Sequence, residues 1–227
     1  FVGSMHNALG YSLVMITAVF GALIAIPMYL LGKEAFNRRV GIISAFLIAT
    51  SASNMMRSVA SWGGYDDVIL FFAIWVFYFF LRALKSVKKS VWTENYFSLK
   101  GWSNGTKKFF LENKISTVYA ALAGISFGTI GAMWQGFVYV EVIILIYLVI
   151  QIFYNRFRNQ SSFHILWITL IFILFSFPVA FPFYLLDNTI TPWFNTPLYL
   201  ALFVVFLIIF IEMTSRWPWV LTYSITA

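Results

Sequence analysis

Residues Phe163–Leu186 read FHILWITLIFILFSFPVAFPFYLL and contain no Asp, Glu, Lys or Arg. A helix needs about 20 consecutive apolar residues to cross the hydrocarbon core of a bilayer. In the strands of a membrane barrel, lipid-facing and interior residues alternate instead. This continuous run therefore predicts a membrane-spanning helix and excludes a barrel strand.

Further apolar windows lie on both sides of this stretch. They are Ala8–Leu31, Val40–Met56, Val68–Leu84, Ser116–Met133, Phe137–Phe153 and Pro197–Met213, and another starts near Trp217. The chain is 61% hydrophobic and 10% charged, whereas a soluble domain carries about 25% charged residues. Its mean hydropathy is +0.85. The sequence predicts an all-α polytopic membrane bundle with about seven full membrane helices and the start of another.

Basic residues are distributed unevenly between the connections. One alternating set of connections, with the helix end at Arg82, holds 14 of the 15 Lys and Arg residues. The other set holds Arg57 together with Asp66, Asp67 and Asp187. Because cytoplasmic loops are enriched in Lys and Arg, the first set is predicted to be cytoplasmic and the second to face outward. The net charge of +7 is explained by this asymmetry, which argues against a nucleic-acid partner.

The outward connection from Arg57 to Asp67 reads RSVASWGGYDD. Its two adjacent carboxylates are the oxygen ligands that Mg²⁺ or Mn²⁺ prefers. The same carboxylates suit the first turn of the next helix, where acidic side chains complement the helix dipole. The residues alone leave both interpretations open.

Other polar or small residues within the apolar windows are also candidates. Glu141 lies one to two turns into a window, so it is either a functional group or a hydrogen-bonded packing residue. Glu212 precedes Arg216 by one helical turn, which favours a surface ion pair. Gly124-x-x-x-Gly128 predicts close packing of one helix against a neighbour. Cysteine is absent, which excludes thiolate metal ligands.

Three motifs occur in order along the first two thirds of the chain. They are YLLGKEAFN at Tyr29–Asn37, RSVA with GYD from Arg57 to Asp66, and WQGFVYV at Trp134–Val140. Together they resemble the catalytic subunit of oligosaccharyltransferase, which carries "YLL-x-KE", "SRSVAGSYD-x-E" and "WGGYV" motifs. The resemblance covers most of residues 8–150.

The resemblance implies a membrane glycosyltransferase of the GT-C type. Such an enzyme transfers an oligosaccharide from a polyprenyl (pyro)phosphate lipid to the Asn of Asn-x-Ser/Thr acceptors on the outer membrane face. It implies that Asp66 binds a catalytic Mn²⁺ or Mg²⁺ and that Arg57 acts in catalysis. The family's second acid falls at Val68, so Asp67 is a substitute candidate, and the loop is longer by about two residues near Ser61-Trp62. Candidates for substrate binding or support of the site are Tyr65, Trp134, Gln135 and Glu141.

The resemblance also implies an organisation and a location. We expect helices two to eight and the start of a ninth in this chain, with the first acidic motif, a later outer-loop Glu and a WWDYG-bearing soluble domain outside it. Lean loops favour an archaeal-type enzyme in the plasma membrane, and the endoplasmic reticulum membrane is the alternative. Two functional alternatives remain open: another lipid-phosphate-sugar transferase, such as a protein O-mannosyltransferase, and a transporter or structural membrane subunit.

Overall fold

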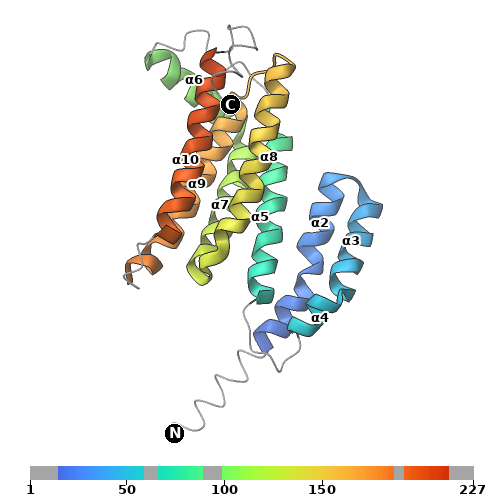
Figure 1. The fold of residues 1–227 in the computed structure, drawn as a ribbon. Helices are drawn as coiled ribbons and strands as arrows, with labels where there is room; N and C mark the ends of the chain where they lie inside the picture. The colour runs from blue at the N-terminus through green and yellow to red at the C-terminus, as the bar shows by residue number, and fades with distance from the viewer. Residues whose placement is uncertain (1–14, 59–65, 89–98, 187–191, 215–227) are drawn as a thin grey trace. The chain divides into compact units, whose positions relative to one another are not determined.

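A computed structural model describes residues 15–58, 66–88, 99–186 and 192–214 (Figure 1). In these ranges the only regular structure is helical, which confirms the predicted all-α class. Six of the described helices are long and apolar enough to cross a membrane. They are Met15–Ala35, Asp66–Ser86, Lys114–Met133, Gln135–Phe157, Phe163–Leu185 and Phe194–Met213. The chain is therefore a multi-pass integral membrane protein.

The first spanning helix has a local irregularity at Ile24, where α2 (Ala25–Ala35) is set off from the preceding turns. Pro27 has no N–H to donate to the carbonyl of Leu23, so one helical hydrogen bond is lost there. Backbone bonds on either side continue the helix: Ile24 N donates to Phe20 O (3.0 Å) and Met28 N to Ile24 O (3.3 Å). The span therefore remains one element with a turn in it.

The window Val40–Met56, predicted as one membrane helix, is divided into α3 (Arg38–Thr50) and α4 (Ala52–Ser58). The break falls at Ser51, whose hydroxyl donates to Ile48 O (3.0 Å) and accepts from Asn54 N (3.3 Å). This hydroxyl offers the backbone an alternative to helical bonding. At about 1.5 Å per residue, the 13 residues of α3 extend about 20 Å. That length is short of the roughly 30 Å hydrocarbon core.

Contacts along the chain divide it into two compact units, Phe1–Leu81 and Arg82–Ala227, which are described separately. In the first, α2 and α3 form a tight hairpin. A Cβ added to Gly32 would lie 3.0 Å from the Cα of Gly41. Two glycines facing each other thus let the two helix backbones touch.

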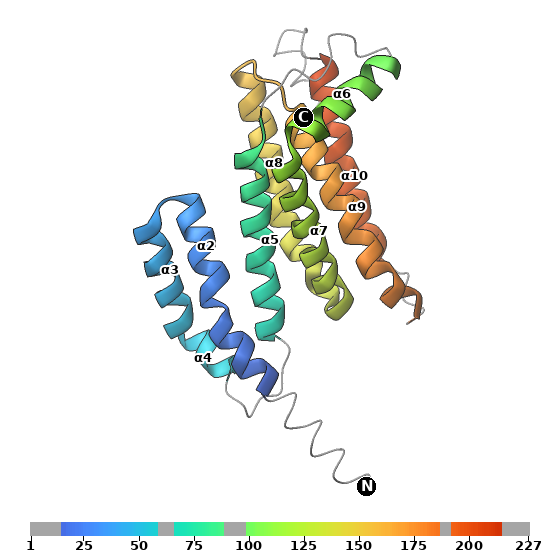
Figure 2. The same cartoon turned by 180° about the vertical axis from the view of Figure 1, so that it is seen from behind.

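The second unit begins with the end of α5 (Asp66–Ser86) and continues through α6 (Leu99–Glu112). It then contains α7 (Lys114–Met133), the short turn η1 (Gln135–Phe137) and α8 (Val138–Phe157). It closes with α9 (Phe163–Leu186) and α10 (Pro192–Met213). Figures 1 and 2 show α7, α8, α9 and α10 side by side as a bundle, with α6 across one end.

The closest packing in this bundle joins α7 to α9. A Cβ on Gly124 or Gly128 would collide with the backbone oxygens of Phe172 and Ser176. The small residues are therefore needed for backbone approach, as the Gly-x-x-x-Gly spacing predicts.

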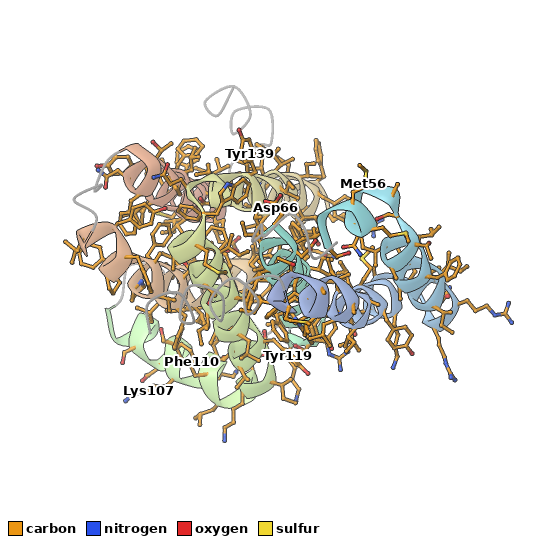
Figure 3. The ribbon with its side chains drawn as sticks, turned by 90° about the horizontal axis from the view of Figure 1, so that it is seen from below. Met56, Asp66, Lys107, Phe110, Tyr119 and Tyr139 are labelled. Carbon is orange, nitrogen blue, oxygen red and sulfur yellow. The ribbon has the colours of Figure 1, made fainter. Side chains whose placement is uncertain are left out.

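The bundle has two chemically different ends. At the first, the amphipathic helix α6 is anchored by Phe109, whose buried ring stacks on Trp167 of α9 at 6.1 Å. Lys107 lies at the outer edge of α6 (Figure 3). Arg156 lies in the last turn of α8 and Arg158 directly follows this helix, a few residues before α9 begins. We call this end the basic end. The opposite end carries the turn from α7 to α8.

Candidate functional site

Asp66 and Asp67 are the first two residues of α5. Consecutive helical residues project about 100° apart, since the helix has 3.6 residues per turn. Accordingly, Asp66 is exposed, whereas Asp67 is only 1% exposed. Both carboxylates lie where the N-terminal end of the helix dipole favours negative charge. The helix-terminal role predicted for the pair is thus compatible with a ligand role for Asp66.

The surroundings of Asp67 come from the first spanning helix and α4. A Cβ added to Gly21 would lie 3.6 Å from Asp67 Oδ2 and would collide with Ser58. The buried side chain of Asn54 donates from Nδ2 to Gly21 O at 3.3 Å. Gly21 therefore lies among three polar residues, Asn54, Ser58 and Asp67, near the start of α5.

An aromatic contact holds α5 beside the first spanning helix. The ring of Phe20 meets that of Phe71 edge-on, with centroids 5.0 Å apart. Phe71 lies about one turn from Asp67 on α5. Apolar packing thus fixes the helix that carries the two carboxylates.

The donor chemistry at Asp66 suits a hard divalent cation, but the ligand set is incomplete. Among the described residues, no three His, Cys, Asp or Glu side chains come together. Mg²⁺ takes six ligands at near-octahedral geometry, of which one or two are commonly carboxylates and several are waters. Asp66 fits the carboxylate part of such a set. Tyr65 lies outside the described residues, and Arg57 belongs to α4 with its side chain outside the description.

In the second unit, Trp134 and Gln135 form the turn between α7 and α8. Trp134 is extended (φ −147°, ψ 125°), and the one-turn η1 follows it. A Cβ on Gly136 would collide with the indole ring of Trp134. Glycine at this position therefore allows the indole to fold back over its own turn.

A cavity of about 160 Å³ lies beside this turn. Trp134, Gln135 and Tyr184 line it, and Tyr184 is 4% exposed. No hydrogen-bond partner for the Tyr184 hydroxyl occurs in the described part of the chain. An indole, an amide and a phenol provide an apolar face and polar groups, which is the mixed lining typical of small-molecule sites.

Glu141 lies in the first turns of α8 and is 1% exposed. Neither carboxylate oxygen has a hydrogen-bond partner within the residues that the structure describes. The packing interpretation of Glu141 required a hydrogen bond, and that bond is not found here. Buried polar groups are nearly always hydrogen-bonded, so Glu141 stays a candidate for a functional role.

The candidate residues therefore fall into two groups. Asp66 and Asp67 belong to the first unit, and Trp134, Gln135 and Glu141 to the second. Sequence analysis missed Asn54 and Tyr184. A polar residue inside an apolar window was a signal for Asn54, whereas the position of Tyr184 depends on how α9 packs.

Comparisons with known proteins give one positive result. The family described as "Oligosaccharyl transferase STT3, N-terminal" matches residues 6–227. No curated protein and no solved structure matches the chain significantly. The family match covers nearly the whole chain, in agreement with the three motifs at Tyr29–Asn37, Arg57–Asp66 and Trp134–Val140. This chain belongs to the STT3 family of oligosaccharyltransferase catalytic subunits.

Proposed function

We propose that this chain forms the membrane part of an enzyme that transfers an oligosaccharide from a polyprenyl (pyro)phosphate lipid to the Asn of Asn-x-Ser/Thr acceptors. The family match supports N-glycosylation in general. The observation that carries the finer proposal is the exposed carboxylate of Asp66 at the very start of a membrane-spanning helix. A donor with a lipid tail and a water-soluble glycan must react at such a boundary.

The reaction breaks the bond between the anomeric carbon and a phosphate oxygen, which keeps the electron pair. A bond forms between that carbon and the acceptor amide nitrogen, which loses a proton. Asp66 would accept a hydrogen bond or ligate a divalent cation at this boundary, and Asp67 would support it from the buried side. When bound, Mn²⁺ or Mg²⁺ would neutralise charge on the leaving phosphate. In this proposal Arg57 acts in catalysis, and Tyr65 binds substrate or supports the site.

The cavity at Trp134, Gln135 and Tyr184 supports a role of this turn in substrate binding. The charge distribution predicts that both the Arg57–Asp67 connection and the Trp134–Gly136 turn face outward. We infer that the protein lies in the plasma membrane with this face toward the cell exterior. The alternative is the endoplasmic reticulum membrane, with this face toward the lumen.

The experiment uses the full-length protein in nanodiscs with a lipid-linked oligosaccharide and a fluorescent Asn-x-Thr peptide. Asp66→Asn removes the anionic ligand with little change of shape. We expect it to lower turnover about 100-fold or more, since even groups that support a metal ligand are worth 10–100-fold. Glu112→Gln, which neutralises an exposed carboxylate on α6, is the matched control and should retain full turnover. Equal turnover of Asp66→Asn and wild type would remove the ligand role from Asp66.

The same assay separates the alternative functions. A peptide with Gln in place of Asn should receive no glycan. Transfer to its Thr would instead identify an O-glycosyltransferase. Absence of transfer to either peptide, together with loss of a transport activity in Glu141→Gln, would favour a transporter.

A further inference from the structure

The basic end of the second unit contains a cavity that the proposed function does not use. Its volume is about 270 Å³, and its lining includes Arg156, Asn159, Ser161, Ser162 and Glu212. A water molecule occupies about 30 Å³ in the liquid, so the cavity has room for a group of roughly nine water volumes.

The turn that forms one wall is well defined. Asn159 adopts a left-handed conformation (φ 53°) directly after α8. Asn159 N donates to Arg156 O (3.1 Å), and Gln160 N donates to Asn155 O (2.8 Å). These two bonds form a Schellman motif with Asn at the residue where glycine is most common. The wall is therefore held by backbone bonds.

Two charged side chains of opposite sign line the cavity and are buried. Arg156 is 8% exposed and Glu212 is 6% exposed. Arg156 donates from Nη2 to Thr214 O at 3.0 Å. Glu212 Oε2 accepts a hydrogen bond from Ser162 N, also at 3.0 Å. Glu212 is buried and so does not occupy the surface position predicted for it, while Arg216, its predicted partner, lies outside the described residues.

These bonds place each charge at the helix end that stabilises it. Glu212 contacts the residue preceding α9, where the helix dipole is positive, and Arg156 contacts the end of α10, where it is negative. Two side-chain hydrogen bonds support them. Gln151 Nε2 donates to Asn155 Oδ1 (2.9 Å), and Asn155 Nδ2 donates to Ser162 Oγ (3.2 Å). The two charges are thus fixed in position before any ligand arrives.

The hydrogen bond from Ser162 N does not use the full acceptor capacity of the Glu212 carboxylate. An ionised carboxylate offers about four acceptor positions, and in the described residues Glu212 accepts one hydrogen bond. A primary ammonium supplies three donors, whereas a quaternary ammonium supplies none. The guanidinium of Arg156 and the serine hydroxyl groups in the same lining are suited to phosphate. A ligand that satisfies both kinds of group carries an ammonium and a phosphate.

The position of the cavity indicates where such a ligand comes from. α8 ends at Phe157 and α9 begins at Phe163, and both are membrane-spanning. The cavity lies at their junction, and since membrane-spanning helices end near the headgroups, we infer that it lies at headgroup level. We propose that it binds the headgroup of an inner-leaflet lipid with a primary ammonium and a phosphodiester, as in phosphatidylethanolamine.

The test measures lipid retention by the full-length protein in native mass spectrometry, after equilibration with equimolar dioleoyl-phosphatidylethanolamine, -phosphatidylcholine and -phosphatidylglycerol. Wild type should retain phosphatidylethanolamine about tenfold over phosphatidylcholine, the ratio expected when hydrogen bonds to a charged group are lost. Glu212→Gln keeps an oxygen that can accept from Ser162 N, so it should fold, but it removes the charge. We expect the preference to fall to parity in this variant.

Glu112→Gln removes a carboxylate from the exposed surface of α6 at the same end, and it should keep the wild-type preference. Equal retention of phosphatidylethanolamine and phosphatidylcholine by wild type would overturn the proposal. A preference for phosphatidylglycerol over both would do so as well, because it would reflect general attraction to the basic loops. If Glu212→Gln were not monodisperse in size-exclusion chromatography, Glu212→Asp, whose shorter side chain withdraws the carboxylate from the cavity, would replace it, with the same expected loss.

Discussion

Glu141 offers the sharpest test of how this bundle balances stability against function. The carboxyl group is 1% exposed, and both oxygens lack a partner among the described residues. In protein mutational data, burying a polar group without a hydrogen bond costs about 1–3 kcal/mol. Glu141→Met keeps the length of the side chain and removes the polar atoms. We therefore expect this variant to be more stable than wild type by about 1–3 kcal/mol.

The assay is thermal unfolding of the purified full-length protein in detergent, followed by intrinsic fluorescence, with turnover measured on the same samples. Because a gain in the free energy of unfolding raises Tm, an increase in Tm is expected. Glu141→Gln leaves a buried polar group and serves as the matched control, with a Tm near that of wild type. Turnover should fall in Glu141→Met, because a polar group kept at a cost in stability commonly serves function.

A lower Tm in Glu141→Met would refute this reasoning. It would mean that the carboxyl group has a stabilising partner in the full-length protein. Breaking a satisfied buried interaction costs several kcal/mol, so the two outcomes differ in sign and are easily distinguished.

Two further predictions concern packing and capping. Gly128→Leu should destabilise the protein by about 1–3 kcal/mol or more through overpacking, because a Cβ there already collides with Ser176 O; Leu122→Phe on a partly exposed position of α7 should change Tm little. Asn37→Ala should cost about 0.5–2 kcal/mol, because Asn37 Oδ1 caps α3 by accepting from Val40 N at 3.0 Å. Unfolding in detergent measures both, and an unchanged Tm in either variant would contradict the contact behind it.

The sequence was informative where one physical effect dominates. The apolar run Phe163–Leu186 appears in the structure as α9 with the same bounds, since hydropathy over more than 20 residues decides membrane insertion. Gly124 and Gly128 likewise pack as their spacing predicts, because only small residues permit backbone contact.

Prediction failed where the outcome depends on individual side-chain hydrogen bonds, either within a helix or between residues distant in sequence. The division of Val40–Met56 depends on hydrogen bonds of Ser51, which looks ordinary in an apolar window. The burial of Glu212 arises because Ser162, 50 residues earlier, lies at the start of a neighbouring helix. Local spacing suggested Arg216 instead.

The difference between Asp66 and Asp67 has a similar origin. Both were predicted at a helix start, and both are found there. Which one is buried depends on Gly21 and Ser58 from other helices, and no spacing rule gives that information. The exposed residue is the one that the resemblance selects as a metal ligand.

The central claim is that Asp66 supports N-glycosylation by this protein. The most direct measurement is mass-spectrometric identification of the modified residue in an Asn-x-Thr peptide after incubation with the full-length enzyme and a lipid-linked oligosaccharide. The account predicts glycan on Asn with wild type and with Glu112→Gln, and about 100-fold less or none with Asp66→Asn. Glycan on Asn at wild-type yield with Asp66→Asn, or glycan attached to Thr, would contradict it.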